Sequence, residues 1–382
     1  MAPRRLPFLL LLLFAFLTPF ISLAYVVFGL LAAAWAAELH RERRFPRSLR
    51  APIAFLLALI AIFTILSALF SRDLSVSARH LPGLSLLALV PIAMDLVDGE
   101  SRARSLFLSL AGSAVLLAIL GIWQFLHGGN ELDNRIRGTL SHYMTFSGLT
   151  MIGGCLLLGF LLEEKGGWRR AGLLFAIPFS AVLLTYTRGA YVGILAALML
   201  FLAIRRPRGL LVLLPVLVAV FLLAPAEIRE RMRSITDLAD RTNRDRIAMA
   251  RAGLRIVRDH PLFGLGPDMV EPYYPLYRDP DAPRWRVPHL HNNVLQIAAA
   301  HGVFAAAAYL ALLVLFFART IHLLRRERRP PRAALWAGAL LAGTALTFAG
   351  LFEYNFGDTE VEMATLLVFA VPFSRAAEAA GD

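Results

Sequence analysis

The sequence predicts an all-α polytopic integral membrane protein with about twelve transmembrane helices and one large extracytoplasmic loop. The first observation is composition: 58% of the 382 residues are hydrophobic, 17% are charged, and the mean hydropathy is +0.63. Soluble domains carry about a quarter charged residues. The second observation is that apolar stretches of about 17 to 25 residues recur, the length that a helix needs to cross the hydrocarbon core. The short alternating segments typical of a membrane β-barrel are absent.

The apolar stretches give the expected spans in chain order. They lie at approximately 6–19, 20–38, 51–70, 81–97, 105–126, 144–162, 170–186, 189–204, 209–224, 291–318, 333–352 and 361–374. The first pair is the least distinct, because Pro19 interrupts about 32 apolar residues, too many for one ordinary span and few for two. We interpret this N-terminal stretch as retained membrane helix and not as a cleaved signal peptide, since no small-residue cleavage site follows it cleanly and apolar sequence continues to Ala37.

Basic residues give the predicted orientation. If the N-terminus is cytoplasmic, the cytoplasmic segments hold 22 Lys and Arg residues, against 5 in the short loops on the other side. This bias follows the positive-inside rule, and a single missed span would destroy the alternation. The formal net charge of +12 therefore reflects topology, and no nucleic-acid partner is expected.

Three regions follow from this topology. Residues 1–224 form an N-terminal transmembrane bundle of about nine helices, and residues 291–382 add about three more. Between them, the extracytoplasmic loop 225–290 holds 12 arginines and 10 carboxylates. Asn243 or Thr242 could cap a helix that runs to about Asp259. The proline-rich second half of the loop is expected to be irregular.

Two arginines are candidates for anion binding. Arg188 lies in a tight outer turn between two apolar stretches, where a guanidinium is costly unless an anion pairs with it. Arg246 falls on the apolar face of the predicted outer helix, with Ala250, Gly253 and Val257 and opposite an arginine-rich face. The alternatives are a topogenic charge for Arg188 and a structural salt bridge for Arg246.

The segment His289-Leu290-His291-Asn292-Asn293 stands where the loop returns to the membrane. We expect His291 in the first turn of the next helix, where the positive helix end keeps the imidazole neutral and able to accept a proton. Two histidines at i and i+2 also suggest a metal site, but no carboxylate or cysteine stands beside them at ligand spacing. Cys155 is the single cysteine, so no intramolecular disulfide is expected.

Two further outer turns carry polar residues whose role the sequence leaves open. The last outer turn is either a solvated acidic loop or functional; it holds Glu353, Asn355, Asp358 and Glu360. The outer turn within 138–147 is equally open and contains His142 and Tyr143. Glu131 and Asp133, which precede it, are expected to be solvated.

Over roughly residues 138–360, the chain resembles the superfamily of membrane O-antigen ligases and polymerases. The most specific motif is His-Asn, nine residues, then Gly-x-x-small, here His291, Asn292, Gly302 and Ala305, although the family prefers Gly at the last position. The Arg188-Gly189 turn is also similar. So is an arginine, Arg246, in an outer helix that leads into Asp-His-Pro-Leu-Phe-Gly-Leu-Gly at 259–266. Ala250 stands where the family usually carries Trp.

The resemblance implies a glycosyl transfer outside the cytoplasmic (inner) membrane, without a metal or another cofactor. The donor would be a glycan on a polyprenyl pyrophosphate such as undecaprenyl pyrophosphate, and the acceptor a hydroxyl on lipid A-core, another glycan or a protein. His291 would be the general base and Arg188 and Arg246 would bind the pyrophosphate. Further substrate contacts would come from Asn292, His289 and Glu353. A neutral imidazole suits a sugar hydroxyl near pH 7, and arginine forks neutralise a leaving pyrophosphate.

Alternatives remain at this point. A ligase and a polymerase need the same base and anion clamp, and acceptor choice would lie in the loop 268–288. The aromatic residues of that loop either stack on sugars or pack at the membrane interface; they are Tyr273, Tyr274, Tyr277 and Trp285. A transporter of bicarbonate or another small anion should bury charges near the bilayer midplane, whereas the candidates here lie at the outer rim. A scaffold protein without enzymatic activity would not explain the positions of Arg246 and His291.

Overall fold

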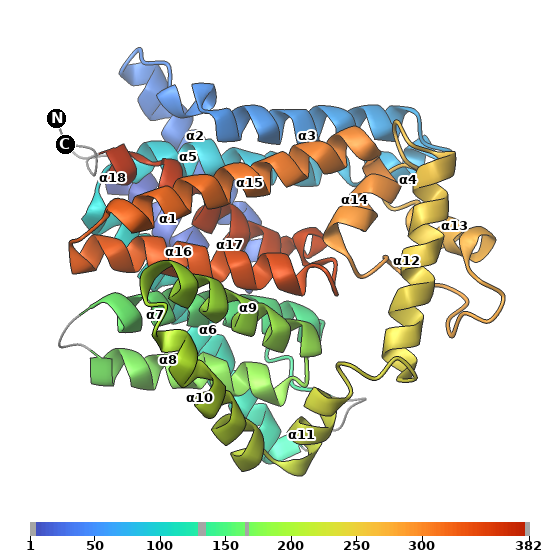
Figure 1. Cartoon of the computed structure of the whole chain (residues 1–382). Coiled ribbons are helices and arrows are strands. Elements are labelled where there is room, and N and C mark those ends of the chain that lie inside the picture. Colours follow the sequence, from blue (N-terminus) through green and yellow to red (C-terminus); the bar gives the residue numbers. More distant parts are fainter. Residues whose placement is uncertain (1–4, 129–134, 165–167, 379–382) are drawn as a thin grey trace.

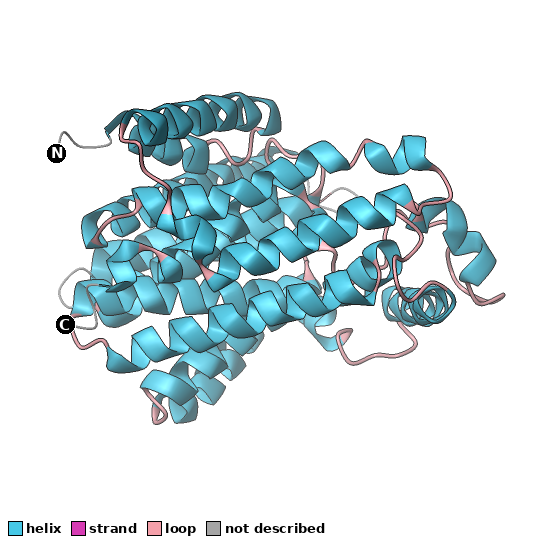
Figure 2. Ribbon diagram, turned by 90° about the horizontal axis from the view of Figure 1, so that it is seen from above, coloured by secondary structure: helices cyan, strands magenta, loops and turns pink. Residues whose placement is uncertain are grey.

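The computed structural model describes residues 5–128, 135–164 and 168–378, and within these ranges every regular element is helical (Figures 1 and 2). The helices of the first part are α1 (Arg5–Phe16), α2 (Ile21–Arg41), η1 (Arg47–Arg50), α3 (Pro52–Leu69), α4 (Leu74–Ala78), η2 (Leu81–Ala88), α5 (Leu89–Leu96), α6 (Glu100–Gly128), α7 (Tyr143–Glu163), α8 (Trp168–Leu184), α9 (Arg188–Arg205) and α10 (Gly209–Leu223). The rest are α11 (Ala226–Arg233), α12 (Arg241–Asp259), α13 (Val270–Tyr277), α14 (Asn293–His301), α15 (Val303–Arg326), α16 (Pro330–Ala349), η3 (Asn355–Gly357), α17 (Thr359–Ala370), η4 (Val371–Phe373) and α18 (Arg375–Glu378).

Within the described residues, eight helical segments are long and apolar enough to cross a membrane, so the chain is a polytopic integral membrane protein. They are Ile21–Arg41, Pro52–Leu69, Leu74–Leu96, Glu100–Gly128, Tyr143–Glu163, Arg188–Arg205, Val303–Arg326 and Pro330–Ala349. The other apolar helices of the described residues are shorter than these eight: Arg5–Phe16, Leu174–Leu184, Gly209–Leu223 and the 12-residue α17. Near Pro19 the chain makes two separate helices, α1 and α2, which pack on each other.

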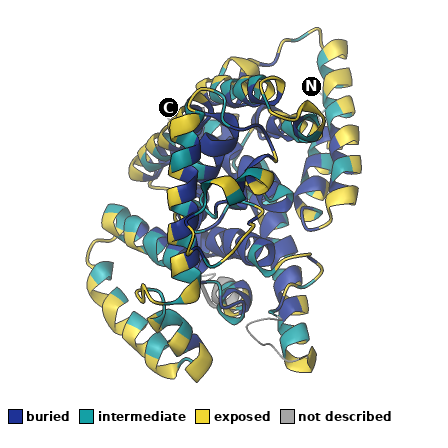
Figure 3. Ribbon diagram, turned by 90° about the vertical axis from the view of Figure 1, so that its right-hand side faces the viewer, coloured by how far each residue is buried: buried dark blue, intermediate teal, exposed yellow. Residues whose placement is uncertain are grey.

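The centre of the bundle is the pair α7 and α16, which is mostly buried (Figure 3). Small residues let the two backbones approach closely: a Cβ on Gly159 would lie 2.3 Å from the amide nitrogen of Gly338. Similarly, a Cβ on Gly193 of α9 would lie 2.4 Å from the carbonyl oxygen of Ala345 in α16. Such close helix packing is the main source of cohesion between helices in lipid, where apolar burial gives little.

One end of the bundle is held by a continuous set of ion pairs. Their members come from segments that the sequence assigns to a single side of the membrane: Arg44 with Asp95 (2.7 Å), Arg104 with Glu164, Arg205 with Glu163 (3.2 Å) and Arg332 with Glu100 (3.2 Å). A guanidinium Nη2 of Arg205 also donates to the carbonyl of Glu327 (2.9 Å). The helix ends that carry these pairs lie opposite to α12 and α13 in Figure 1. The predicted alternation of helix ends is therefore consistent with the fold.

The segment 225–290 forms its own small core against α14. Apolar side chains of α12, α13 and α14 meet there, among them Met249, Ile256, Met269, Tyr274 and Leu290. The predicted helix ends at Asp259 as expected, but its cap was misassigned: Asp240 accepts from the amides of Thr242 (3.0 Å) and Asn243 (3.2 Å), and α12 begins at Arg241. The second half of the segment, expected to be irregular, contains α13.

Gly302 explains why the expected span 291–318 is two helices. Its φ is +88°, and a Cβ there would lie 2.0 Å from the carbonyl oxygen of Leu262. The break between α14 and α15 lets the amide of Val303 donate to the carbonyl of Pro261 (2.8 Å) and the amide of Leu265 donate to that of Ala299 (2.9 Å). The glycine of the His-Asn…Gly motif is thus a backbone requirement of this junction.

Candidate active site

A cavity of about 410 Å³ lies where α7, α9, α11, α12 and the approach to α14 meet; we call it the first cavity. It brings together four residues that the sequence singled out, namely Arg188, Arg246, His289 and His291. These residues come from segments about 50 to 100 positions apart, so the fold and not local sequence assembles the site. The rest of the lining is Arg135, His142, Tyr143, Met144, Tyr186, Thr187, Arg231, Thr242, Asp245, Met249, Arg284 and Pro288.

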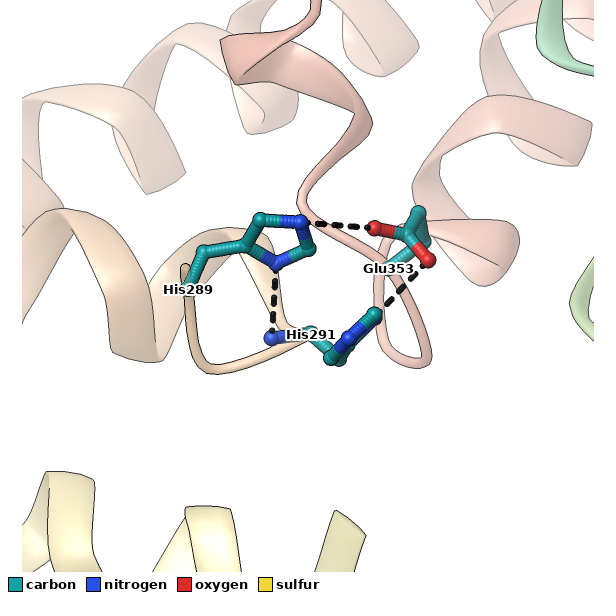
Figure 4. Close-up of side chains that lie close together, drawn as sticks. All are labelled: His289, His291 and Glu353. Atoms are coloured by element: carbon teal, nitrogen blue, oxygen red, sulfur yellow. Dashed lines mark hydrogen bonds and ion pairs between the residues drawn. The ribbon is translucent and has the colours of Figure 1, made fainter. Parts of the chain in front are cut away.

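A carboxylate that is distant in sequence holds both histidines (Figure 4). His291 Nδ1 donates to Glu353 Oε2 at 2.9 Å, and His289 Nε2 lies 3.4 Å from Glu353 Oε1. The amide of His291 donates to His289 Nδ1 at 3.3 Å. With its Nδ1–H directed at Glu353, His291 keeps the Nε2 lone pair as its basic atom.

The electrostatics of this site favour an ionised Glu353 and a neutral His289. Burial lowers the pKa of His289 to about 4, with the neighbouring His291 adding to the effect and Glu353 opposing it. Burial alone would raise the pKa of Glu353, but the hydrogen bond from His291 and the nearby charges of His291, His289 and Arg246 outweigh it and lower the pKa below its usual value.

His291 does not stand in the first turn of a helix, contrary to the expectation. Helix α14 begins at Asn293, and Asn292 is its cap, with Oδ1 accepting from the amide of Leu295 (2.9 Å). His291 precedes the cap with a φ of +50°, a backbone conformation that residues other than glycine rarely adopt. Asn292 Nδ2 donates to the carbonyl of Leu351 (3.1 Å), so both polar atoms of the Asn292 side chain already have protein partners. Asn292, predicted to contact substrate, does not line the first cavity.

Arg246 faces the first cavity without a partner for its guanidinium in the described part of the protein. Among the described residues it has no hydrogen bond or ion pair, and its nearest named contact is the ring of Phe352, 5.9 Å from the guanidinium carbon. Burial lowers its pKa, while Glu353 opposes that change and Arg188 adds to it. The alternative of a structural salt bridge does not apply within the described part of the chain. A buried guanidinium that faces a cavity is a ready site for an anionic ligand.

Arg188 is buried, with 4% of its surface exposed, and it does have a protein anion. Its Nη2 lies 2.9 Å from Asp240 Oδ1, and its Nη1 donates to the carbonyl (2.6 Å) and to the hydroxyl (2.9 Å) of Ser234. Because Asp240 also caps α12, Arg188 joins the start of α9 to the start of the helix that carries Arg246. The anion that the sequence argument required is therefore at least partly Asp240, and Arg188 positions Arg246 as well as lining the first cavity.

Three more arginines, not identified from the sequence, make the first cavity strongly cationic. Arg135 lies over the ring of Tyr143 at 4.4 Å, and Arg284 pairs with Asp245 at 2.8 Å. Arg231 donates from Nε to the carbonyl of Tyr186 (3.2 Å), and burial together with Arg188 and Arg135 lowers its pKa to about 10. Five arginines thus face one carboxylate in the described lining. Such a surplus favours a ligand that carries more than one negative charge.

The comparison with protein families agrees with this site. Residues 173–310 match the family model described as O-antigen ligase. Residues 173–310 are an O-antigen ligase domain. The expectation of an enzyme of this family is confirmed. No curated protein matches the chain.

The O-antigen ligase domain contains Arg188, Arg246, His289 and His291, whereas Glu353 and His142 lie outside the matched residues. The last outer turn therefore contributes to the site from beyond the domain boundary. It is not a solvated acidic loop: Glu353, Asn355 and Glu360 are buried. Asn293 Nδ2 donates to Asn355 Oδ1 at 2.7 Å and so fixes this turn to the start of α14.

Two residues outside the ligase domain, Asp358 and His142, lie near the site on the side of α7. Asp358 accepts from Thr145 Oγ1 at 3.0 Å, and burial, with the nearby charge of Glu353, raises the pKa of Asp358 to about 7. His142 caps α7 by accepting from the amide of Met144 (3.3 Å), lines the first cavity, and has its pKa lowered mainly by burial. The predicted solvation of Glu131 and Asp133 lies outside the described residues.

The aromatic residues of the loop 268–288 differ in burial, and their two expected roles stay predictions. Tyr274 is fully buried in the small core, and the hydroxyl of Tyr277 lies 3.1 Å from His260 Nε2. Trp285 is exposed, with the guanidinium of Arg278 over its ring at 4.8 Å. Trp285 is therefore the most exposed aromatic residue of this loop.

The geometry also revises the argument about metal. His289, His291 and Glu353 each offer a ligand atom, and these atoms lie within 4.8 Å of one another. The sequence argument missed this possibility because Glu353 is about 60 positions away. One carboxylate oxygen already accepts from His291 and the other faces His289, however, and the arginines of the first cavity raise the cost of a cation. The arrangement fits an oriented imidazole base better than a metal centre.

Proposed function

We propose that this chain transfers a glycan from a polyprenyl pyrophosphate, such as undecaprenyl pyrophosphate, to a hydroxyl acceptor on the outer face of the cytoplasmic membrane. The observation that supports this most is the pairing of an unpartnered guanidinium, Arg246, with a Glu353-oriented imidazole, His291, at one cavity. One group suits the departing pyrophosphate and the other suits the attacking hydroxyl. The match to the O-antigen ligase family agrees with a lipid-linked glycan as substrate.

The proposed reaction is a direct displacement. The acceptor oxygen attacks the anomeric carbon, its proton passes to His291 Nε2, and the bond from the anomeric carbon to the pyrophosphate oxygen breaks with its electron pair. Glu353 stabilises the imidazolium that forms, as a carboxylate does behind a histidine base. Arg246, with Arg188 and Arg231 beside it, stabilises the charge that grows on the pyrophosphate. The anomeric configuration is inverted, and no metal takes part.

The proposal includes a topology of twelve membrane segments with a cytoplasmic N-terminus. The ion-paired end of the bundle, with Arg205, Glu163 and Arg332, would face the cytoplasm, and the first cavity would face the outside. The donor carries its own activation, so the reaction can run where no ATP is available. Every arginine of the first cavity belongs to the outer rim or the loop and none to a mid-membrane position, which favours an enzyme over an anion transporter.

Ligase and polymerase remain alternatives within this proposal, and one experiment separates them. The gene would be expressed in a host that lacks its own O-antigen ligase but makes the lipid-linked glycan, and surface glycan would be compared by gel. A ligase restores glycan on lipid A-core in that host. A polymerase instead restores long glycan ladders in a second host, one that lacks its own polymerase. If neither host responds while the protein is inserted in the membrane, the proposed function is wrong, and anion uptake becomes the next assay.

A further inference from the structure

A second cavity, also of about 410 Å³, lies on the far side of the segment that carries Glu353, between α2, α3, η2, α14 and α17. It shares no lining residue with the first cavity. The two are separated by consecutive residues: Glu353 bonds to the histidines of the first cavity, while the Tyr354 ring lines the second. Tyr354 also contacts His289, with ring centroids 5.8 Å apart. The reaction described above uses none of the residues that line the second cavity.

The second cavity contains polar groups that have no protein partner. His301, at the end of α14, is 6% exposed, and its Nδ1 has no hydrogen-bond partner among the described residues. In that same part of the chain, no hydrogen bond or ion pair joins the carboxyl of Glu362 to another side chain. A buried imidazole nitrogen without a partner is costly, so both groups are explained most simply by a ligand that exchanges hydrogen bonds with them.

The charges of the second cavity differ from those of the first. His80 and Asp268 form a pair, with Nδ1 and Oδ1 3.6 Å apart, and Asp268 has a φ of +60°. The lining holds Arg79 and His80 against Asp268 and Glu362, so it has no surplus of arginine that would attract a pyrophosphate. Donors and acceptors set among tyrosine rings, without a dominant charge, are the groups that bind the hydroxyls and C–H faces of a sugar.

We propose that the second cavity binds an uncharged saccharide unit of the acceptor, through His301 and Glu362 with Tyr25 and Tyr354 as aromatic walls. The assignment to the acceptor rests on the proposed function. The reacting hydroxyl must reach His291 Nε2 in the first cavity, so the second cavity would hold a neighbouring saccharide unit of the same acceptor. The Glu353-Tyr354 segment lies between the two cavities: Glu353 orients the base, and the Tyr354 ring lines the second cavity.

The first test measures binding without any reaction. Purified protein in detergent is titrated with neutral methyl hexosides (glucoside, galactoside and mannoside) by saturation-transfer NMR. We expect at least one of them to bind the wild type, and Glu362→Gln to weaken that binding about 5- to 10-fold, the effect of one lost hydrogen bond of good geometry. Glu360→Gln is the matched control: it makes the same change two residues away on α17, at a residue that does not line the second cavity. Arg246→Ala, in the first cavity, should also leave hexoside binding unchanged.

The second test assigns the saccharide to the acceptor. In a transfer assay with purified donor and acceptor, Glu362→Gln and His301→Leu should raise the acceptor KM about 5- to 10-fold and leave the donor KM unchanged. The proposal is overturned if no hexoside binds the wild type up to about 50 mM, if Glu362→Gln binds as the wild type does, or if the donor KM rises instead. Failure of the proposed function would look different, because the wild type would then transfer no glycan although hexoside binding could persist.

Discussion

Replacing His291 with alanine should lower the rate of glycan transfer about 10²- to 10⁴-fold, the usual contribution of a positioned general base. The loss should fall on kcat, because the imidazole acts on the proton of the attacking hydroxyl and not on the binding of the donor. His289 cannot replace it: its Nδ1 accepts from the amide of His291 and its Nε2 faces Glu353, so neither nitrogen is free.

His260→Ala is the matched control for that experiment. His260 belongs to the same loop and has a hydrogen bond to Tyr277, but it lines neither cavity. Both variants would be purified, checked for an unchanged elution volume and thermal midpoint, and assayed with the same donor and acceptor. Equal activity of His291→Ala and His260→Ala would remove the base from the mechanism.

Removal of the Arg246 guanidinium should lower kcat about 10²- to 10³-fold, the range observed when one group that stabilises developing charge is lost. Arg246 has no protein anion among the described residues, so Arg246→Ala leaves no buried carboxylate unpaired, and its effect should be on activity more than on stability. Arg246→Lys keeps the charge but loses the planar fork, and it should recover only part of the rate.

The control for Arg246 is Arg251→Ala on the same helix. Arg251 is largely exposed, lies outside both cavities, and leaves Asp279 still paired with Arg255. Arg188→Ala serves as a contrast, since it would leave Asp240 without its partner and should lower the thermal midpoint as well as the activity. Full activity of Arg246→Ala would refute the assignment of this residue to the leaving group.

Sequence reasoning predicted the helical class and four residues of the first cavity (Arg188, Arg246, His289 and His291) because these depend on local signals. Runs of apolar residues and the distribution of arginine predict helices and their alternation. Arg246 stood out because a charged residue on the apolar face of a helix must have a reason to be there. His291 and Arg188 stood out because they lie at outer turns beside apolar stretches, where a charged or titratable side chain is costly unless it has a partner or a function.

The sequence could not give what depends on contacts between distant segments. Asp240 satisfies Arg188 across about 50 residues, and Glu353 orients His291 across about 60, so neither partner is visible in a local pattern. The position of His291 before the helix was missed because Asn292 and not Pro288 sets the start of α14. The break inside the expected span 291–318 was missed, because the backbone approach that requires Gly302 comes from Leu262, about 40 positions earlier. The second cavity left no signal at all, because His301 and Glu362 read as ordinary members of apolar helices.

The most direct test of the account is transfer by the purified protein alone. The protein would be incubated in detergent with a glycan on undecaprenyl pyrophosphate, with a lipid A-core acceptor and with excess EDTA, and the anomeric configuration of the new linkage would be determined by NMR. The account predicts transfer at an undiminished rate in EDTA, with inversion at the anomeric carbon. Retention of configuration would contradict the direct displacement, and a loss of activity in EDTA that zinc restores would make His289, His291 and Glu353 a metal site instead of a base and its carboxylate.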